Sequence, residues 1–204
     1  MCATEKDMNK TIVVNVEKCL ACKSCELACA IEHSRSKVLE EAVTESPSPQ
    51  RMVTVEAAGK YGVPMQCRHC EDAPCIAVCP TAAIHRCREN DPVVIDEGKC
   101  IGCKFCLMVC PFGVIDITRD GKAVAKCDLC LQRTKAGKEP ACVASCPTGA
   151  LKFCQLAEAL IKRRQLAAQK GFDAAAAAQN ATGEKQISST QKNRNKPKKE
   201  ENNK

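Results

Sequence analysis

The chain has very few aromatic residues: of its 204 residues none is Trp, one is Tyr and four are Phe. Aromatic side chains normally supply much of the buried mass of a protein core, so a chain of this length needs another filler at its centre. The same scarcity weighs against a nucleic-acid partner, because proteins that bind single strands stack the bases on exposed aromatic rings.

A long apolar run is also missing. No stretch approaches the roughly 18–20 apolar residues that a membrane-spanning helix needs, which predicts no direct membrane span. The first ten residues hold no apolar run, no small-residue cleavage site and no twin-arginine pair, the features expected of an export signal. The sequence therefore predicts a cytoplasmic protein, in a compartment where thiols stay reduced.

Cysteine is the residue in excess, with 19 in the chain. Such a content is typical of a disulfide scaffold or of a metal protein, and a reducing compartment favours metal. Most of the cysteines fall into four quartets, within residues 19–29, 67–80, 100–111 and 127–147. The quartets are Cys19, Cys22, Cys25, Cys29; Cys67, Cys70, Cys75, Cys79; Cys100, Cys103, Cys106, Cys110; and Cys127, Cys130, Cys142, Cys146.

The spacing within the quartets predicts four [4Fe–4S] clusters bound by these sixteen cysteines. Quartets one and three read C-x2-C-x2-C-x3-C, and quartets two and four widen the second gap; Pro80, Pro111 and Pro147 follow three of the quartets. This is the run of bacterial ferredoxins, in which the fourth cysteine ligates the other cluster of a two-cluster protein. Structural zinc sites also use C-x2-C pairs, but zinc knuckles lack the third cysteine two residues further on.

The chain repeats internally, which predicts an α+β fold of two ferredoxin-like units related by duplication. Residues 18–25 match 99–106, and residues 79–84 match 146–151. We expect a four-cluster domain over residues 1–154, with an inserted loop at about 30–66 and helical turns after the C-x3-C steps. The expected strands are Thr11–Val16, Val93–Asp96, Gly113–Thr118 and Ala150–Phe153.

Beyond the cysteine-rich part, residues 155–171 have helical periodicity, with Gly171 as the expected stop. Residues 172–204 are polar and basic, and their composition predicts a disordered tail. Residues 155–204 hold 11 Lys and Arg against 5 Asp and Glu, so they account for +6 of the net charge of +7. Once the cysteine thiolates bind iron, residues 1–154 carry a net negative charge. This charge argues against nucleic acid as a binding partner.

The histidines offer no metal-ligand spacing, and we expect His33, His69 and His85 to be solvated or bonded to backbone. His69 and Arg68 lie inside quartet two, where a positive charge would raise the potential of that cluster. Nothing in the sequence resembles a catalytic site: it has no phosphate-binding loop, nucleotide fingerprint or cysteine set for a nickel or pterin centre. The chain is therefore expected to exchange electrons and not to be an enzyme by itself.

The order and spacing of the quartets resemble the four-cluster iron–sulfur subunits of dimethyl sulfoxide reductase, formate dehydrogenase and formate hydrogenlyase. Residues 19–36 most resemble the iron–sulfur protein associated with carbon monoxide dehydrogenase. This resemblance implies a wire subunit that carries electrons from carbon monoxide dehydrogenase to a hydrogenase or a flavoprotein. Three alternatives stay open: the equivalent subunit of a molybdenum or tungsten formate dehydrogenase with a hydrogenase, a free soluble polyferredoxin, and a redox or iron sensor.

The resemblance also implies a nested pairing of the quartets, in which quartet one exchanges its fourth cysteine with quartet four, and quartet two with quartet three. The sequence by itself leaves a sequential pairing, one with two, open. The nested sets are Cys19, Cys22, Cys25 with Cys146; Cys127, Cys130, Cys142 with Cys29; Cys67, Cys70, Cys75 with Cys110; and Cys100, Cys103, Cys106 with Cys79.

Overall fold

The computed structural model describes residues 10–89 and 91–174, which belong to two compact units that divide between Leu156 and Ala157. The described part of the second unit is helical. This helix begins at Leu156, the last residue of the first unit, and is described up to residue 174. The predicted C-terminal helix is confirmed, but its predicted stop is wrong. Gly171 lies inside the helix without a positive φ, and an interior glycine costs only about 1 kcal/mol relative to alanine. The predicted tail beyond residue 174 lies outside the described residues.

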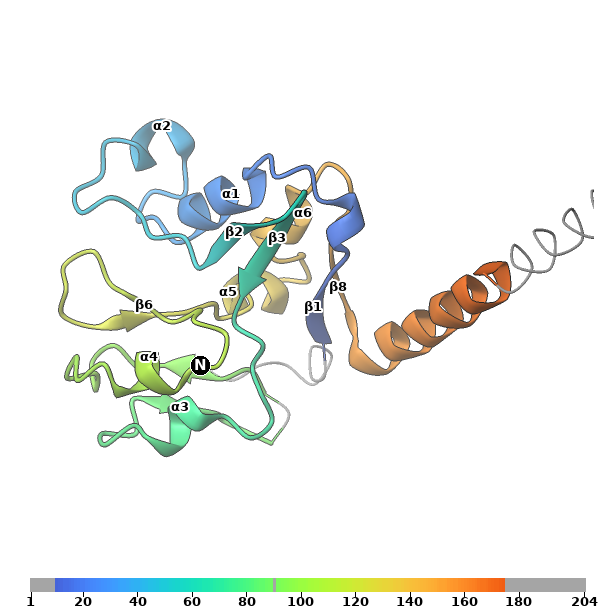
Figure 1. Ribbon diagram of the computed structural model, residues 1–204. Coiled ribbons are helices and arrows are strands. Elements are labelled where there is room, and N and C mark those ends of the chain that lie inside the picture. The colour runs from blue at the N-terminus through green and yellow to red at the C-terminus, as the bar shows by residue number, and fades with distance from the viewer. Residues whose placement is uncertain (1–9, 90, 175–204) are drawn as a thin grey trace, which may run out of the picture. The chain divides into compact units, whose positions relative to one another are not determined.

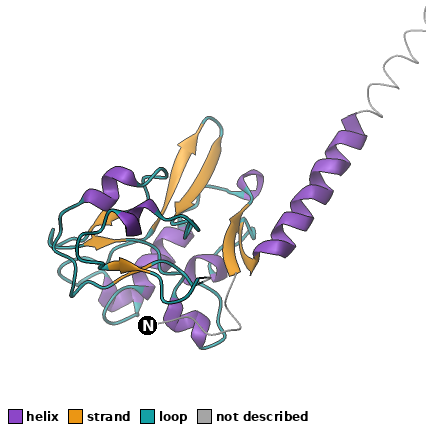
Figure 2. Ribbon diagram, turned by 90° about the horizontal axis from the view of Figure 1, so that it is seen from below, coloured by secondary structure: helices purple, strands orange, loops and turns teal. Residues whose placement is uncertain are grey.

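The first unit is a mixture of short strands and short helices, as the α+β prediction requires (Figure 1). Its described residues form eight strands in four separate antiparallel pairs, and Figure 2 shows how much of the path between them is loop. The pairs are β1 (Lys10–Val14) with β8 (Leu151–Gln155), β2 (Val53–Ala58) with β3 (Tyr61–Gln66), β4 (Ile84–His85) with β5 (Val94–Ile95), and β6 (Asp116–Ile117) with β7 (Val124–Ala125).

Four of the helices lie on the C-x3-C steps and do not follow them, so their predicted position is wrong. Each begins next to the third cysteine of a quartet, and the side chains of the third and fourth cysteines then project from successive turns of one helical segment. They are α1 (Ser24–Glu32), α3 (Pro74–Ala77), α4 (Phe105–Val109) and α6 (Ala141–Ala144). The other helical elements are a 3-10 helix, η2 (Val16–Lys18), and two helices, α2 (Leu39–Ala42) and α5 (Leu131–Lys135). Nowhere in the described chain is there a helix with the length and apolar character that crossing a bilayer demands.

The predicted inserted loop at 30–66 is also wrong, because this segment contains α2 and the β2–β3 hairpin. Val53 and Val55 point into the core as alternating β-branched residues, and Gly59 turns the chain with φ of 59°. The hairpin occupies the same place between quartets one and two that β6–β7 occupies between quartets three and four. It therefore belongs to the duplicated pattern and is not an addition to it.

The two halves of the duplicated chain are interlocked, because β1 pairs with β8 and β4 pairs with β5. As a result there are two hydrophobic cores, and each mixes the halves. Ile12, Val55 and Leu151 pack with cysteines of quartets one and four. Ile84, Val93 and Val124 pack with cysteines of quartets two and three. Sulfur takes the place of the missing aromatic rings in both cores.

A buried carboxylate ties α1 to the hairpin. Glu26 accepts a hydrogen bond from the Val55 amide at 2.7 Å through Oε1, and its Oε2 lies 3.2 Å from Nε of Arg51. Close by, a Cβ at Gly62 would lie 2.8 Å from Cβ of Ala21. The hairpin therefore packs directly on the loop that carries the first three cysteines.

Candidate metal centres

Three cavities of the first unit are each lined by four of the cysteines that the sequence singles out. In every case three cysteines come from one quartet and the fourth comes from another. Group A is Cys19, Cys22, Cys25 and Cys146; group C is Cys67, Cys70, Cys75 and Cys110; group D is Cys79, Cys100, Cys103 and Cys106.

The four quartet cysteines that line none of these three cavities form group B, which is the most buried group. Its members are Cys29, Cys127, Cys130 and Cys142, all of them 7% exposed or less. The charge of Cys29 acts on each of the other three thiols, and Cys29, Cys127 and Cys142 belong to one buried cluster, so the four lie close together. The structure thus places twelve of the sixteen predicted residues around three cavities and the other four near one another.

Burial makes group B a poor place for free thiolates. Burial raises the pKa of Cys130 to about 11, and it raises the pKa of Cys127 and of Cys142 well above the ordinary value, with the neighbouring thiolates adding to the shift. Buried thiols of this kind become thiolates together only when a bound cation offsets their charge. A set of four thiol sulfurs suits zinc or an iron–sulfur cluster.

Backbone amides point at the sulfurs because the cysteine loops adopt left-handed conformations. His69 and Leu129 occupy equivalent positions in quartets two and four, with φ of 50° and 58°. Their amides donate to the sulfurs of Cys67 and Cys127, each at 3.4 Å. Amide-to-sulfur hydrogen bonds of this kind are one of the means by which proteins set cluster potentials.

The loop of quartet three requires glycine at position 102. Gly102 has φ of 67°, and a Cβ there would lie 2.5 Å from the carbonyl oxygen of Lys122. Ala21 holds the equivalent place in quartet one, with φ of 54°.

Gly102→Ala is therefore expected to destabilise the loaded protein by about 2–4 kcal/mol, the sum of the left-handed penalty and the clash. Ala21→Gly is the matched control, since it relieves the left-handed penalty and adds no atom. The measurement is the temperature at which the visible absorbance of the bound clusters is lost in the absence of oxygen. Equal behaviour of the two variants would contradict the assignment.

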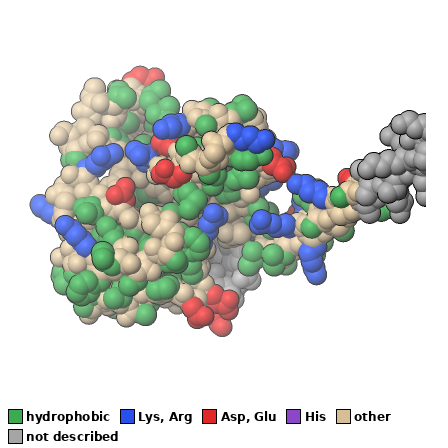
Figure 3. Space-filling view, in the orientation of Figure 1, with side chains coloured by type: hydrophobic (Ala, Val, Ile, Leu, Met, Phe, Trp, Pro, Cys, Tyr) green, Lys and Arg blue, Asp and Glu red, His purple; other side chains and the backbone are tan. Residues whose placement is uncertain are grey.

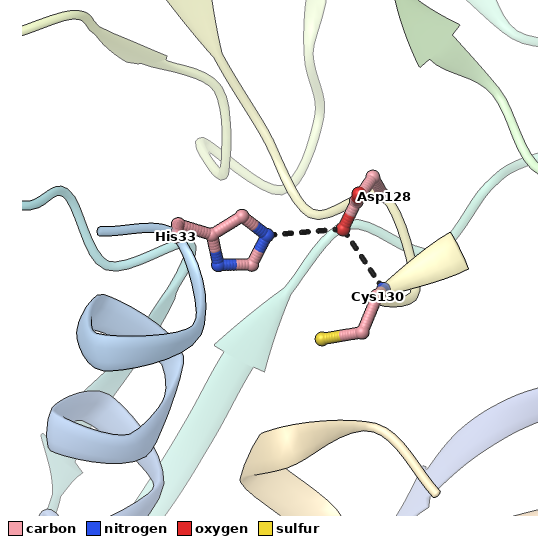
Figure 4. Close-up of side chains that lie close together, drawn as sticks. All are labelled: His33, Asp128 and Cys130. Carbon is pink, nitrogen blue, oxygen red and sulfur yellow. Dashed lines mark hydrogen bonds and ion pairs between the residues drawn. The ribbon is translucent and has the colours of Figure 1, made fainter. Parts of the chain in front are cut away.

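His33 forms an ion pair beside group B, which the sequence did not signal. Its Nε2 lies 3.2 Å from Oδ1 of Asp128, and its Nδ1 lies 2.8 Å from the Cys29 carbonyl oxygen and 3.7 Å from the Cys29 sulfur. Figure 4 shows the ring directed at Asp128, whose carboxylate also accepts the Cys130 amide at 2.8 Å. Because both ring nitrogens face acceptors, the ring donates twice as an imidazolium.

The electrostatics of His33 agree with this protonation. Burial lowers the pKa of His33, but the hydrogen bonds and negative charges of Asp128 and Cys29 outweigh burial and raise it to about 11. Nitrogen, carboxylate oxygen and the Cys130 sulfur lie within 4.8 Å of one another. Since Cys130 already belongs to group B and the carboxylate is paired, this trio supports the thiol group and is not a separate metal site.

The expectation of a solvated or cationic His69 is wrong. Both of its ring nitrogens are buried and make no hydrogen bond of good geometry within the described residues, although the Val93 backbone lies close enough to act on the ring. Burial, together with the charges of Lys126 and Arg86, lowers its pKa well below the ordinary value. The ring is thus neutral and is neither solvated nor a cation beside group C.

The sequence assigned a positive charge at group C to His69 and Arg68; Arg68 lines the group C cavity, and Arg86 adds a second guanidinium to the loop. The Arg86 guanidinium donates to the carbonyl oxygens of His69 at 3.2 Å, of Cys70, of Glu71 at 3.4 Å and of Glu89 at 2.9 Å. The first three of these carbonyls are consecutive in the loop of quartet two. Arg86 therefore fixes the path of this loop.

Comparison with known proteins finds iron–sulfur proteins among the relatives of this chain. Residues 59–156 match the family described as the 4Fe-4S dicluster domain. An iron-sulfur protein of Rhodospirillum rubrum is 44% identical over 176 residues, which is 79% of this chain and 90% of the relative. The thiosulfate reductase electron transfer subunit of Salmonella typhi is 36% identical over 157 residues (76% and 81%). A component of the anaerobic dimethyl sulfoxide reductase of Escherichia coli is 38% identical over 161 residues (76% and 78%).

These relatives and the matched domain confirm the predicted resemblance at the level of the family, and they confirm that the chain contains a 4Fe-4S cluster-binding domain. The chain therefore belongs to the family of iron–sulfur electron-transfer subunits that contain a 4Fe-4S dicluster domain.

Proposed function

We propose that the chain holds four [4Fe–4S] clusters, one in each of groups A to D, and acts as the wire subunit of a redox complex. The observation that carries this proposal is the gathering of sixteen cysteines into four sets of four, three of them around cavities. In groups A and B, quartets one and four exchange their fourth cysteines; in groups C and D, quartets two and three do so. This exchange supports the nested pairing.

The packing supports the order A, B, C, D along the wire. Groups A and B contribute to one hydrophobic core, and groups C and D to the other, except that Cys67 of group C packs against the first core. Groups B and C meet where the two cores adjoin, because Lys126, next to Cys127 of group B, bonds to the carbonyl of Val93, which lines the group C cavity. Electrons would thus cross from one ferredoxin-like unit to the other between groups B and C.

Both ends of this order reach the surface. Cys22 of group A and Cys103 of group D are exposed, whereas the other members of these groups are less accessible. Leu20 is 69% exposed and Ile101, its equivalent in the duplicated loop, is 66% exposed. Hydrophobic side chains also gather over the region of α3 and α4 in Figure 3. We propose that redox partners dock at these two ends, where electrons enter and leave.

The role of the protein in this function is to position and bury the clusters, which supply one-electron chemistry once bound. The thiolates hold iron, the amides of residues such as His69 and Leu129 bond to sulfur, and the two cores exclude water. No catalytic role of its own is proposed for the chain. The catalytic subunit would be a separate protein.

For the catalytic partner we propose a carbon monoxide dehydrogenase, with a hydrogenase or a flavoprotein at the other end of the wire. The support is the resemblance of residues 19–36 to the iron–sulfur protein associated with that enzyme. Two of the relatives are subunits of a thiosulfate reductase and a dimethyl sulfoxide reductase. The alternative partners are a reductase of this kind, or a molybdenum or tungsten formate dehydrogenase that acts with a hydrogenase.

Metal analysis of the native complex, purified without oxygen through a tag on this chain, tests the proposal. The expected result is about sixteen irons per chain, four for each cluster, after subtraction of iron in co-purifying proteins. Nickel would support the carbon monoxide dehydrogenase once activity assays separate it from a nickel hydrogenase, and molybdenum or tungsten would support the alternative. Iron without any second chain would favour a free polyferredoxin, and zinc in place of iron would overturn the proposal.

A further inference from the structure

Lys126 is a buried cation without a carboxylate partner. Its residue is 4% exposed, and its Nζ donates to the carbonyl oxygens of Val93 and, at 2.9 Å, of Cys127. No carboxylate of the described residues lies within ion-pair distance of this ammonium group. A buried charge is costly unless its surroundings compensate for it, so the surroundings of Lys126 need to be negative.

The ammonium group faces both inner groups of thiols. On one side it bonds to the carbonyl of Cys127, a member of group B. On the other side it bonds to Val93, which lines the group C cavity, and its charge acts on the thiol of Cys75 and on the ring of His69. A single positive charge is thereby shared between groups B and C.

Other charged groups near the thiols do not combine these properties. The imidazolium of His33 is paired directly with Asp128, so the pair has no net charge. Arg86 is cationic, but its bonds go to the loop of group C and to Glu89. Among the described residues, Lys126 is the cation that contacts both sides of the junction between the two ferredoxin-like units.

We propose that Lys126 raises the reduction potentials of the two inner clusters together and so sets the central electron step of the wire. The inference rests on the proposed function. Reduction adds one negative charge to a cluster, and a cation fixed nearby in a low-dielectric interior stabilises the reduced form more than the oxidised form. Because Lys126 faces groups B and C, the reduction potentials of both inner clusters rise. The two potentials then stay close to each other, so the electron is not trapped on either cluster.

The internal duplication provides a matched control at Gln66. Gln66 precedes Cys67 as Lys126 precedes Cys127; Gln66 is the last residue of β3, Lys126 directly follows β7, and Gln66 is 1% exposed. The two positions therefore have equivalent places in the fold and comparable burial, but only one of them carries a charge. Replacement of Gln66 by Met perturbs packing without removing a charge.

The experiment is a redox titration of the complete chain in its native complex, purified without oxygen and followed by electron paramagnetic resonance. In Lys126→Met and Lys126→Gln, two of the four potentials are expected to fall. For each of these two clusters, the ratio of reduced to oxidised form at a fixed applied potential should fall at least tenfold. A tenfold change corresponds to a shift of about 59 mV in the potential of a one-electron couple. Lys126→Arg, which keeps the charge, and Gln66→Met are expected to stay closer to the wild-type values.

Two outcomes would overturn the inference and leave the proposed function standing: four unchanged potentials in both neutral variants at full iron content, or equal shifts in Gln66→Met. If the wild-type protein itself contains no set of four clusters, the proposed function fails and the inference fails with it. The Gln variant keeps a polar side chain at the junction, so the charge can be tested even if Lys126→Met does not retain its clusters.

Discussion

Replacing Cys22 or Cys146 by Ser should remove one and the same cluster, whereas replacing Cys29 should remove a different one. Cys22 and Cys146 line the cavity of group A, although they come from quartets one and four. Cys29 follows Cys22 in the same quartet, yet its charge acts on the thiols of group B. Each single variant is expected to lose about four of sixteen irons. Because the clusters act in series, each variant should also fail to transfer electrons from one end of the chain of clusters to the other.

Double variants make this prediction decisive, since the effects of two residues that share a site do not add. Cys22→Ser with Cys146→Ser should lose about four irons, no more than either change alone, and Cys22→Ser with Cys29→Ser about eight. The measurements are iron per chain and the number of spin signals after full reduction. A sequential pairing would differ in the first double variant only: Cys22 would share its cluster with Cys79, so the pair of Cys22 and Cys146 would lose two clusters, while the pair of Cys22 and Cys29 would still lose two.

The sequence predicted the parts of this protein that local spacing determines. The spacing of the cysteines predicts the cysteine-bearing loops, because a short loop has to bring three thiols to one small metal centre. This requirement does not depend on the rest of the fold. The mixed fold with its C-terminal helix was predicted for the same kind of reason, from local periodicity. β1 was expected at Thr11–Val16 and is found at Lys10–Val14, a shift of the size that strand ends normally show.

The residues that the sequence did not reveal act through distant partners. His33 meets Asp128 across 95 positions of the chain, and Lys126 reaches Val93 across 33. A single histidine or lysine has no spacing pattern, so nothing local distinguishes it from a solvated side chain. The β2–β3 hairpin was missed for a different reason: Ser-Pro repeats before it and Pro64 within it are typical of loops, while the alternating Val53 and Val55 that should have predicted a strand form only a short run.

The second large effect is expected at Arg86, whose replacement by Ala should destabilise the loaded group C by about 2–4 kcal/mol. The guanidinium satisfies the carbonyl oxygens of His69, Cys70, Glu71 and Glu89. Hydrogen bonds to a charged donor contribute more than neutral ones, and an acceptor left without its donor in a partly buried loop adds a desolvation cost. The loop that presents Cys67 and Cys70 would then lose the support that fixes its path.

Arg68→Ala is the matched control for Arg86→Ala because it also removes one guanidinium charge from the surroundings of group C. The Arg68 guanidinium lies 6.0 Å from the centre of the Phe112 ring, a contact that contributes only about 0.5–1 kcal/mol. Bleaching of the visible absorbance during heating without oxygen should therefore begin at a clearly lower temperature in Arg86→Ala than in Arg68→Ala, with an early loss of about four irons. Arg86→Lys should fall between them, since an ammonium keeps the charge but does not reach several carbonyls with a planar fork. If both alanine variants lost the cluster at the same temperature, the charge would matter and the carbonyl contacts would not.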